Sequence, residues 1–322
     1  MRICAKLFND INFEPDAVQP CCNVHWIRVP RFPFNGGPLD MQAYAEHIGS
    51  VMDELQHSGP LCQGCPDLQE HDLGQNRNVC ILFRTVSINM HRYQCNCRCV
   101  YCDLWQHAEK GSGYPILPAL QSLAEQHVLD KQCYFSWGGG EPTILKDFEA
   151  ASSWILQQGY PQYVHTNALR YSPAVESLLR QGRGAVNVSL DSASPGVYRA
   201  VKGVDAFTRV VEHVRRYAAA ACTPGLVHVK YIVFAKNNSV KEIAHFLDLC
   251  CSLGVDVVQY SLNFAELNTG SAQATSLLGA AFLRHHAAEL GLRTEPFFIP
   301  PAEMEAIDKL EQEHFGAVAA QA

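Results

Sequence analysis

The chain has 322 residues, 48% of them hydrophobic, and this length suits one large domain or a large domain with a small appendage. Lys and Arg number 25 against 32 Asp and Glu, and the net charge of −7 argues against nucleic acid as a partner. The first residues form no signal-peptide core, and no run approaches the ~20 apolar residues of a membrane helix. Fourteen cysteines in such a chain favour metal binding over disulfides, so we expect a cytoplasmic protein.

Residues 1–75 differ in pattern from the rest of the chain. Two short extended pieces are predicted between Phe8 and Asn23, around a turn at residues 14–17 that contains Pro and Asp. A helix is predicted from Met41 to Leu55, because Tyr44, Ile48, Met52 and Leu55 share one face. The segment contains Cys4, Cys21, Cys22, Cys62 and Cys65. Four thiolates that include one C-x2-C pair suit structural zinc as well as an iron–sulfur cluster.

Residues 76–264 alternate between predicted strands and helices. The strands are expected at Cys80–Met90, Cys133–Trp137, Tyr163–Asn167, Ala185–Asp191, Leu226–Phe234 and Val255–Tyr260. Ser172 before Pro173 predicts one helix start, and Ser239 with Glu242 predicts a capping box at another. Strands that alternate with helices indicate a parallel sheet, and six repeats fall short of the eight that close a barrel. We therefore expect an α/β fold, an open (β/α)6 TIM-like partial barrel.

Residues 265–322 form a C-terminal extension rich in predicted helix. An Ala- and Leu-rich helix comes first, then an extended piece at Leu292–Ile299, then a final amphipathic helix. This extension either caps the open edge of the sheet or lines a substrate cavity, and the sequence leaves both open.

The segment from His91 to Trp105 concentrates cysteines. Cys95, Cys99 and Cys102 are separated by three and two residues. An iron–sulfur cube is normally held by four thiolates, so a loop that offers three leaves one iron open to a small molecule. Zinc is the competing interpretation, although these gaps are cramped for the usual pair of knuckles. Cys97 lies between these positions, and we expect it to point away or to act later in the chemistry.

Polar or glycine-rich residues follow several of the predicted strands, where working loops lie in parallel α/β folds. Gly138, Gly139 and Gly140 would let the backbone approach a ligand, and Glu141 can accept a hydrogen bond from an ammonium group. A tight turn without a ligand is the alternative. Later strand ends carry Thr-Asn-Ala at 166–168 and Ser-Leu-Asp at 189–191, and capping explains these residue types too.

The spacing C-x3-C-x-aromatic-C, formed by Cys95, Cys99, Tyr101 and Cys102, resembles the signature loop of the radical S-adenosylmethionine (radical SAM) enzymes. The resemblance implies a partial barrel and a [4Fe-4S] cluster whose open iron chelates S-adenosylmethionine. It also implies reductive cleavage to a 5′-deoxyadenosyl radical, which abstracts a substrate hydrogen. An external one-electron reductant such as flavodoxin or ferredoxin would be needed. The cofactor would carry the chemistry while the protein positions it.

The same resemblance implies the residues that contact S-adenosylmethionine. The 138–141 segment is similar to the family's GGE motif, which binds the amino group, and residues 189–191 are similar to its S-L-D segment. Residues 166–168 are similar to T-N-G, with Ala168 in place of Gly. Residues 202–207 are similar to R-G-x-x-x-F, with Lys202 in place of an Arg that offers a bidentate fork. The implied contacts are Tyr101, Gly139, Gly140, Glu141, Asn167, Ser189, Asp191 and Lys202.

The N-terminal cysteines resemble the ligand pattern of the SPASM and twitch extensions of radical SAM enzymes. Cys4, Ala17 and Cys22 follow that spacing, with Cys62 and Cys65 as the later pair. Those extensions usually follow the core, and Ala17 replaces their glycine. The resemblance implies an auxiliary [4Fe-4S] cluster held by Cys4, Cys22, Cys62 and Cys65, with Cys21 as the competitor of Cys22.

An auxiliary cluster can accept an electron from a substrate radical, so we expect net oxidation, dehydrogenation or cross-linking of a small molecule or peptide. We see no separate small domain of the kind that binds leader peptides, which favours smaller substrates. The alternative is a radical epimerase with a cysteine hydrogen-atom donor, for which Cys222 and Cys133 are the candidates, although free cysteines are commonly just buried. An alternative of another class is a non-catalytic iron–sulfur electron carrier or scaffold.

Overall fold

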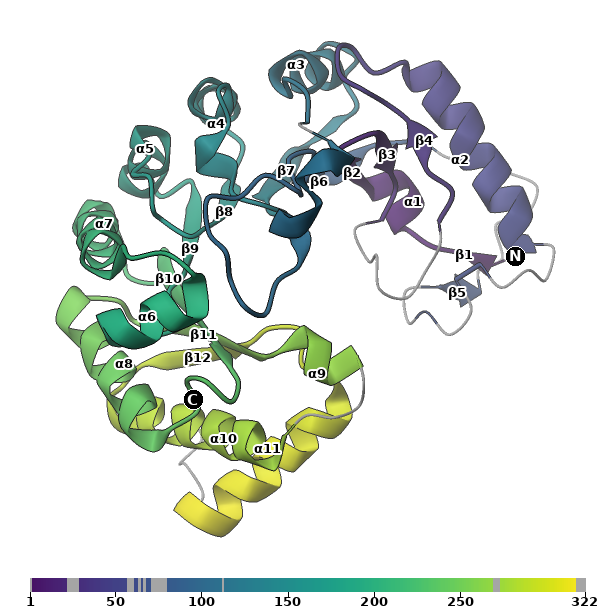
Figure 1. Cartoon of the computed structure of the whole chain (residues 1–322). Coiled ribbons are helices and arrows are strands. Elements are labelled where there is room, and N and C mark those ends of the chain that lie inside the picture. The colour runs from purple at the N-terminus through teal and green to yellow at the C-terminus, as the bar shows by residue number, and fades with distance from the viewer. Residues whose placement is uncertain are drawn as a thin grey trace. The chain divides into compact units, whose positions relative to one another are not determined.

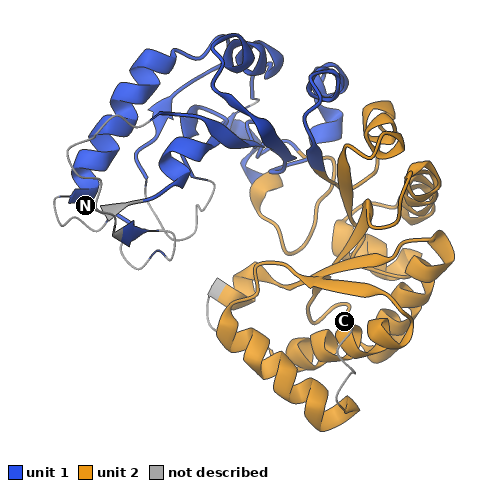
Figure 2. Cartoon of the chain, turned by 180° about the vertical axis from the view of Figure 1, so that it is seen from behind, with its two compact units in different colours: residues 1–94, 106–163 blue, residues 95–105, 164–322 orange. Residues whose placement is uncertain are grey.

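The computed structural model describes residues 2–21, 29–56, 61–62, 65, 68–70, 80–111, 113–268 and 273–316 (Figure 1). The chain divides into two compact units, shown in blue and orange in Figure 2. Unit 1 comprises residues 1–94 and 106–163, and unit 2 comprises residues 95–105 and 164–322. The three-part division at residues 75 and 264 stays a prediction. No helix within the described residues is long and apolar enough to cross a membrane.

The sheet of unit 1 combines parallel and antiparallel strands. Its neighbours are, in order, the start of β8 (Gln162–Thr166), β7 (Leu129–Trp137), β6 (Phe83–Ile88), β2 (Asp10–Glu14), β3 (Ala17–Gln19) and β4 (Phe32–Pro33). Strand β2 pairs in parallel with β6, and it forms a hairpin with β3 around the predicted turn. The two predicted extended pieces are therefore a hairpin that adds a parallel strand to the core. A separate pair joins β1 (Arg2–Ile3) to β5 (Gln69–Glu70).

The helices of unit 1 include the predicted N-terminal one. They are α1 (Lys6–Asn9), α2 (Met41–Gln56), α3 (Leu117–Glu125) and α4 (Phe148–Gln157), with a short 3₁₀ turn at Pro142–Ile144. Helix α2 buries Tyr44, Ile48, Val51 and Leu55, so Val51 rather than Met52 completes its buried face. The ring of Tyr44 meets that of Phe83 in β6, with ring centroids 6.1 Å apart, and this contact fixes α2 against the sheet. A kinked 3₁₀ segment, Leu104–Lys110, contains the boundary between the units.

The sheet of unit 2 continues the alternation of strands and helices. From the end of β8 the order is β9 (Gly184–Ser189), β10 (Val227–Val233), β11 (Val257–Leu262) and β12 (Arg293–Pro296). The pairs β9–β10, β10–β11 and β11–β12 are parallel. The six predicted strands are β6 to β11, and the predicted extended piece in the C-terminal extension is β12, an additional edge strand. The sheet is largely parallel and not closed, which confirms the predicted partial barrel.

Seven helices accompany the strands of unit 2 within its described residues. They are α5 (Pro173–Arg180), α6 (Pro195–Lys202), α7 (Phe207–Ala220), α8 (Val240–Leu253), α9 (Phe264–Asn268), α10 (Ala274–Glu289) and α11 (Pro301–Phe315). Ser172 caps α5 as predicted, and Ser239 accepts a hydrogen bond from the Glu242 amide at the start of α8. The Glu242 carboxylate instead accepts from the Ala193 amide at 2.7 Å, so α8 uses its capping side chain to hold a loop of another element.

Strand β10 separates an apolar face from a polar one. The ring of Tyr231 packs against Phe246 of α8, with ring centroids 4.5 Å apart, so Tyr231 faces the helices. Alternation along the strand directs Lys230 to the opposite face. Helix α10 packs on β10, β11 and β12 from the helix side. The C-terminal extension therefore supplies both an edge strand and part of the helix layer.

Candidate functional site

The loop with Cys95, Cys99 and Cys102 lies in unit 2 and is fixed to the end of α6. The Arg98 amide donates to the Lys202 carbonyl at 2.9 Å, and the Val100 amide donates to the Val201 carbonyl at 3.0 Å. Gly203 follows with φ +69°, and a Cβ there would lie 2.7 Å from the Arg98 carbonyl oxygen. Glycine is therefore required at position 203 by this close approach. The Lys-Gly pair at 202–203 anchors the cysteine loop.

The four thiols of the loop lie together. Cys95, Cys99 and Cys102 are half-buried, whereas Cys97 is 1% exposed. The Cys97 amide donates to Cys95 Sγ at 3.4 Å, and its thiol is a hydrogen-bond partner of Cys95 and Cys99. The expectation that Cys97 points away from the other thiols is therefore wrong, because the one-residue gap leaves its side chain between theirs.

The pKa values of these thiols differ because their surroundings differ. The hydrogen bond with Cys97, then the charge of Lys202, lowers the pKa of Cys99 to about 6. Burial raises the pKa of Cys102 to about 11. Since a metal cluster binds thiolates, Cys99 loses its proton for ligation more readily than Cys102.

Tyr101, Asp191 and Lys202 form a buried network beneath the loop. The Tyr101 hydroxyl donates to Asp191 Oδ2 at 2.6 Å, and Lys202 Nζ donates to the Tyr101 hydroxyl at 2.8 Å. Lys202 also forms an ion pair with Asp191, and both side chains are at most 1% exposed. The Ile232 amide donates to Asp191 Oδ1 at 2.7 Å. All three were expected to contact S-adenosylmethionine, and the structure gives each of them an internal partner.

Asn237 completes this network. Its side-chain amide donates to the Asp191 carbonyl at 3.0 Å and to the Ile232 carbonyl at 2.8 Å. Asp191 has φ +59°, an uncommon conformation for a residue other than glycine. The Asn237 contacts hold that conformation, so Asn237 acts on the cysteine loop through Asp191 and Tyr101.

Asn167 joins the end of β8 to the cysteine loop within unit 2. Its side-chain amide donates to Asn96 Oδ1 at 2.7 Å and approaches Cys95 Sγ at 3.8 Å. Its Oδ1 accepts from the Leu169 amide at 2.9 Å. Ala168 has φ +53°, which is the conformation that glycine adopts freely. The backbone conformation at position 168 therefore explains the glycine of the T-N-G pattern, and this chain adopts that conformation with alanine. Ser189, the other predicted contact on this side, is half-buried at the end of β9.

The glycine segment after β7 lies in unit 1, where its own backbone packing explains two of the glycines. A Cβ on Gly140 would lie 2.0 Å from the Gln94 carbonyl oxygen, and Gly139 has φ +85°. The Glu141 amide donates to that same Gln94 carbonyl at 2.8 Å. The Glu141 carboxylate is buried and accepts from the Thr143 hydroxyl at 2.6 Å. Its contact with a ligand ammonium stays a prediction.

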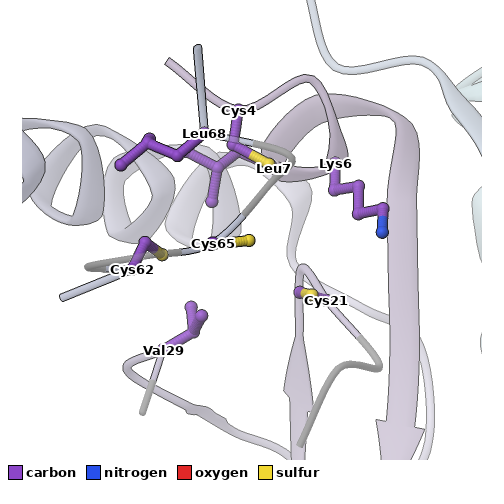
Figure 3. Close-up of a pocket in the computed structure, with 8 residues that line it drawn as sticks. All are labelled: Cys4, Lys6, Leu7, Cys21, Val29, Cys62, Cys65 and Leu68. Atoms are coloured by element: carbon purple, nitrogen blue, oxygen red, sulfur yellow. The ribbon is translucent and has the colours of Figure 1, made fainter. Parts of the chain in front are cut away.

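Four cysteines of unit 1 line one pocket. Cys4, Cys21, Cys62 and Cys65 come from three separate stretches of chain and gather around it, with Lys6, Leu7, Val29 and Leu68 (Figure 3). Burial, and then the neighbouring thiols of Cys65, Cys4 and Cys21, raise the pKa of Cys62 to about 11. Cys22 lies outside the described residues, and Cys21, its predicted competitor, occupies the pocket wall.

The candidate hydrogen-atom donors do not join these sites. Cys133 shares a face of β7 with Trp137, whose ring packs on Phe148 of α4, so its thiol is buried on the helix side. Cys222 is exposed and precedes β10, whereas the Asp191 network contacts the other end of that strand at Ile232. A strand of this length separates its ends by roughly 20 Å. Their catalytic role stays a prediction without a supporting contact.

Lys230 is a charged residue that the sequence reasoning missed. It is 7% exposed in a strand whose other residues are hydrophobic apart from His228. Its position, flanked by hydrophobic residues at 229 and 231, was the available signal, since a lysine is almost never fully buried unless it is paired.

Comparison with known proteins places the chain among radical SAM proteins. The family model described as "Radical SAM superfamily" matches residues 90–250, half of the chain. A "Probable GTP 3′,8-cyclase" of Saccharolobus islandicus (strain Y.N.15.51 / Yellowstone #2) is 28% identical over 169 residues, 51% of this chain and 52% of that protein. A GTP 3′,8-cyclase of Haemophilus influenzae (strain PittEE) is 30% identical over 158 residues, 48% and 46% respectively. The chain thus matches about half the length of these curated relatives.

Solved structures share the fold at low sequence identity. SuiB of Streptococcus suis bound to S-adenosylmethionine has a TM-score of 0.51 at 12% identity, over 85% of this chain and 61% of that one. The enzyme anSMEcpe with bound AdoMet and the Kp18Cys peptide has a TM-score of 0.51 at 16% identity, over 66% and 63%. These likenesses concern the fold. The family match over residues 90–250 contains all three cysteines of the loop, and the chain belongs to the radical SAM superfamily.

Proposed function

We propose that this chain is a radical SAM enzyme that performs a net oxidation, either dehydrogenation or cross-linking, with the help of an auxiliary iron–sulfur cluster. The single observation that carries the proposal is the pair of cysteine groups: a loop with Cys95, Cys99 and Cys102 and a pocket lined by four cysteines. When bound, a [4Fe-4S] cluster with S-adenosylmethionine supplies abstraction of a substrate hydrogen atom. Cys95, Cys99 and Cys102 would hold this cluster.

The residues around the loop fit such a group. Asn167 directs an amide toward Cys95 Sγ, and an amide donor near a cluster thiolate stabilises its charge. The buried Tyr101, Asp191 and Lys202 network fixes the loop from below. These residues would thus hold the three thiolates in place. Cys95, Cys99 and Cys102 are only half-buried, which leaves access for a ligand.

Net oxidation needs an electron acceptor, and we assign this role to a cluster in the four-cysteine pocket. When a C–H bond is oxidised, the hydrogen atom leaves to the cofactor, a proton is lost to water, and one electron remains to be removed. Four cysteine ligands leave no open iron, which suits an electron-transfer cluster. Cys4, Cys21, Cys62 and Cys65 would hold it.

Zinc is the alternative for the pocket. A single zinc ion needs four sulfurs about 2.3 Å from one point. Among the residues that the structure describes, no three His, Cys, Asp or Glu side chains are gathered around such a point. A cube has a separate iron for each thiolate and accommodates a more widely spaced set. Four thiolates suit either metal group, and metal analysis of the purified protein distinguishes zinc from an iron–sulfur cluster.

The substrate class is proposed as a small molecule or a peptide. The neighbour SuiB is known bound to the precursor peptide SuiA, and the matched relatives are named GTP 3′,8-cyclases. A one-electron reductant such as flavodoxin or ferredoxin would serve the first cluster. The epimerase alternative would need Cys222 or Cys133 beside the substrate, and no contact within the described residues supports it.

An iron count on anaerobically reconstituted protein tests the two sites together. If both carry cubes, the wild type holds about 8 irons per chain and the Cys95, Cys99, Cys102→Ala variant holds about 4. A Cys62, Cys65→Ala variant also holds about 4, and the matched control Cys80, Cys251→Ala, at two exposed cysteines, keeps about 8.

Two results would remove the oxidation proposal. One is about 4 irons in the wild type and none in the triple variant, with one zinc per chain. The other is an unchanged iron count in Cys62, Cys65→Ala. Cys21→Ser should lose the auxiliary irons, because Cys21 lines the pocket.

A further inference from the structure

The strand face opposite the helices in unit 2 is polar over three neighbouring strands. Asn187 of β9, Lys230 of β10, and Gln259 and Ser261 of β11 form this polar face, and each is at most 7% exposed. Lys230 is in register with Ser189 on one side and Gln259 on the other. The Asn187 amide donates to Gln259 Oε1 at 2.5 Å, across β10, which shows that these side chains share a face.

The carboxylate of Glu295 in β12 shares this face, but it lies 3.7 Å from His228 and forms no ion pair with Lys230 within the described residues. The Lys230 ammonium lies 4.0 Å from the centroid of the Phe297 ring and 5.8 Å from that of Phe264. Among the described residues it forms no hydrogen bond or ion pair, and the aromatic faces stabilise the cation only in part. A buried ammonium that forms no direct ion pair is costly to the fold, so a bound anion would recover free energy here.

Two further polar atoms on the same face lack partners. Asn187 Oδ1 and Ser261 Oγ are fully buried and have no hydrogen-bond partner among the described residues. Asn187 is in register with His228 and Ser261 with Ile232, so they lie two residues to either side of Lys230 along the sheet. Most buried polar atoms in proteins are paired, so unpaired ones on one strand face need an explanation. An acceptor and a hydroxyl on the same face as Lys230 are groups that would bind a polar ligand.

The polar face is joined to the network under the cysteine loop. The Lys230 carbonyl accepts hydrogen bonds from the Leu190 and Asp191 amides, each at 3.2 Å. Lys230 is also near enough to Asp191 and Lys202 for their charges to act on its pKa, which burial lowers to about 8. A ligand held by Lys230 would therefore lie beside the loop in unit 2.

We propose that Lys230 binds the negatively charged group, a carboxylate or a phosphate, of the substrate, and that Asn187 and Ser261 bind its neighbouring hydroxyl or amine groups. The proposal rests on the function proposed above and narrows its substrate to an organic anion. The Phe297 ring lies beside the ammonium of Lys230 and helps to fix its position. Lys230 is then a specificity-determining residue, and S-adenosylmethionine binds without it.

Competitive acetylation tests this proposal without a known substrate or any turnover. Reconstituted protein saturated with S-adenosylmethionine is treated at pH 8 with trace acetic anhydride, and the acetylation rate of each lysine is measured by mass spectrometry. Inorganic phosphate or malonate should slow acetylation of Lys230 several-fold, because a bound anion shields the amine and favours its protonated form, which does not react. Exposed Lys236 and Lys241 should be unaffected. Protection by phosphate alone indicates a phosphorylated substrate, and protection by malonate alone indicates a carboxylate.

Thermal denaturation provides the variant test. Whichever anion protects Lys230 should raise the melting temperature of the wild type and of Lys236→Met, but not that of Lys230→Met. Ser261→Ala should reduce the rise, whereas Ser276→Ala, which removes an equally buried and unpaired hydroxyl from α10, should not. Neither readout requires cleavage of S-adenosylmethionine. A failure of anion binding can therefore be distinguished from a failure of the proposed function.

Three results would overturn the proposal. The first is that neither anion slows acetylation of Lys230. The second is that S-adenosylmethionine alone protects it and the anions add nothing, which would make Lys230 a cofactor contact. The third is that Lys230→Met responds to the anion as the wild type does.

Discussion

The hydroxyl of Tyr101 donates a hydrogen bond to the buried carboxylate of Asp191 at 2.6 Å. This contact joins the cysteine loop to β9 and β10, because the same carboxylate accepts the Ile232 amide. Tyr101→Phe should lower the free energy of unfolding by about 1.5–3 kcal/mol, the usual contribution of a hydrogen bond to a charged group. Urea unfolding of the apo protein measures it. Tyr93→Phe is the control, since the Tyr93 hydroxyl has no hydrogen bond within the described residues, and equal losses in both variants would contradict the network.

Lys230 predicts an unusual dependence of stability on pH. Its pKa falls from 10.5 to about 8 in the folded chain, so between these values the unfolded chain binds more protons than the folded one. Stability then rises with pH across this window, and below pH 8 the buried charge costs about 3 kcal/mol. Lys230→Met should be more stable than the wild type at pH 7 and should flatten the rise from pH 8 to 10.5. A Lys230→Met variant less stable at pH 7 than the wild type would contradict this.

Ala168 stores backbone strain at the end of β8. Its φ of +53° destabilises an alanine by about 1–2 kcal/mol, whereas glycine adopts this conformation without strain. Glycine also increases the conformational entropy of the unfolded chain, which offsets part of this gain. Ala168→Gly should therefore raise the free energy of unfolding by about 0.5–1 kcal/mol. Ala193→Gly, at a loop alanine without a positive φ, should lower it by a similar amount. Chemical denaturation of both variants measures the difference, and a loss of stability in Ala168→Gly would exclude strain at this turn.

Gly140 is the position where a single methyl group should do most damage. In Gly140→Ala the new Cβ meets the Gln94 carbonyl oxygen at 2.0 Å, so the backbone of unit 1 must move. We expect a loss of about 3 kcal/mol in stability and loss of S-adenosylmethionine binding in equilibrium dialysis. Gly196→Ala is the control, because no atom lies within 4 Å of its new Cβ. Normal binding by Gly140→Ala would show that the turn is not needed for the cofactor.

The repeating part of the fold could be predicted because it depends on local signals. Alternating apolar runs and helical spacing placed β6 to β11 and the helices between them, and Ser172 with Pro173 marked the start of α5. Strands β2 and β12 were predicted as extended, but their pairing was not. The pairing of such segments depends on which strand they meet in the folded chain, and no periodicity in the segment itself encodes this.

The side-chain network of the site was the least predictable part. Asp191 and Lys202 are 11 positions apart in sequence, and only the fold brings them together with Tyr101 as a buried ion pair. Sequence motifs identified these residues as polar positions near the site but not as partners of one another. The direction of the Cys97 side chain and the choice of Cys21 as a pocket residue likewise depend on backbone conformation, which spacing alone does not fix.

The claim on which the account depends is that three cysteines of the loop, and not Cys97, hold a cluster with one iron free for S-adenosylmethionine. The direct test is formation of 5′-deoxyadenosine by anaerobically reconstituted protein given dithionite and S-adenosylmethionine, measured by chromatography with mass spectrometry. We predict product from the wild type and from Cys97→Ala, and none from Cys99→Ala. Absence of product from iron-replete wild type, or undiminished product from Cys99→Ala, would contradict the account.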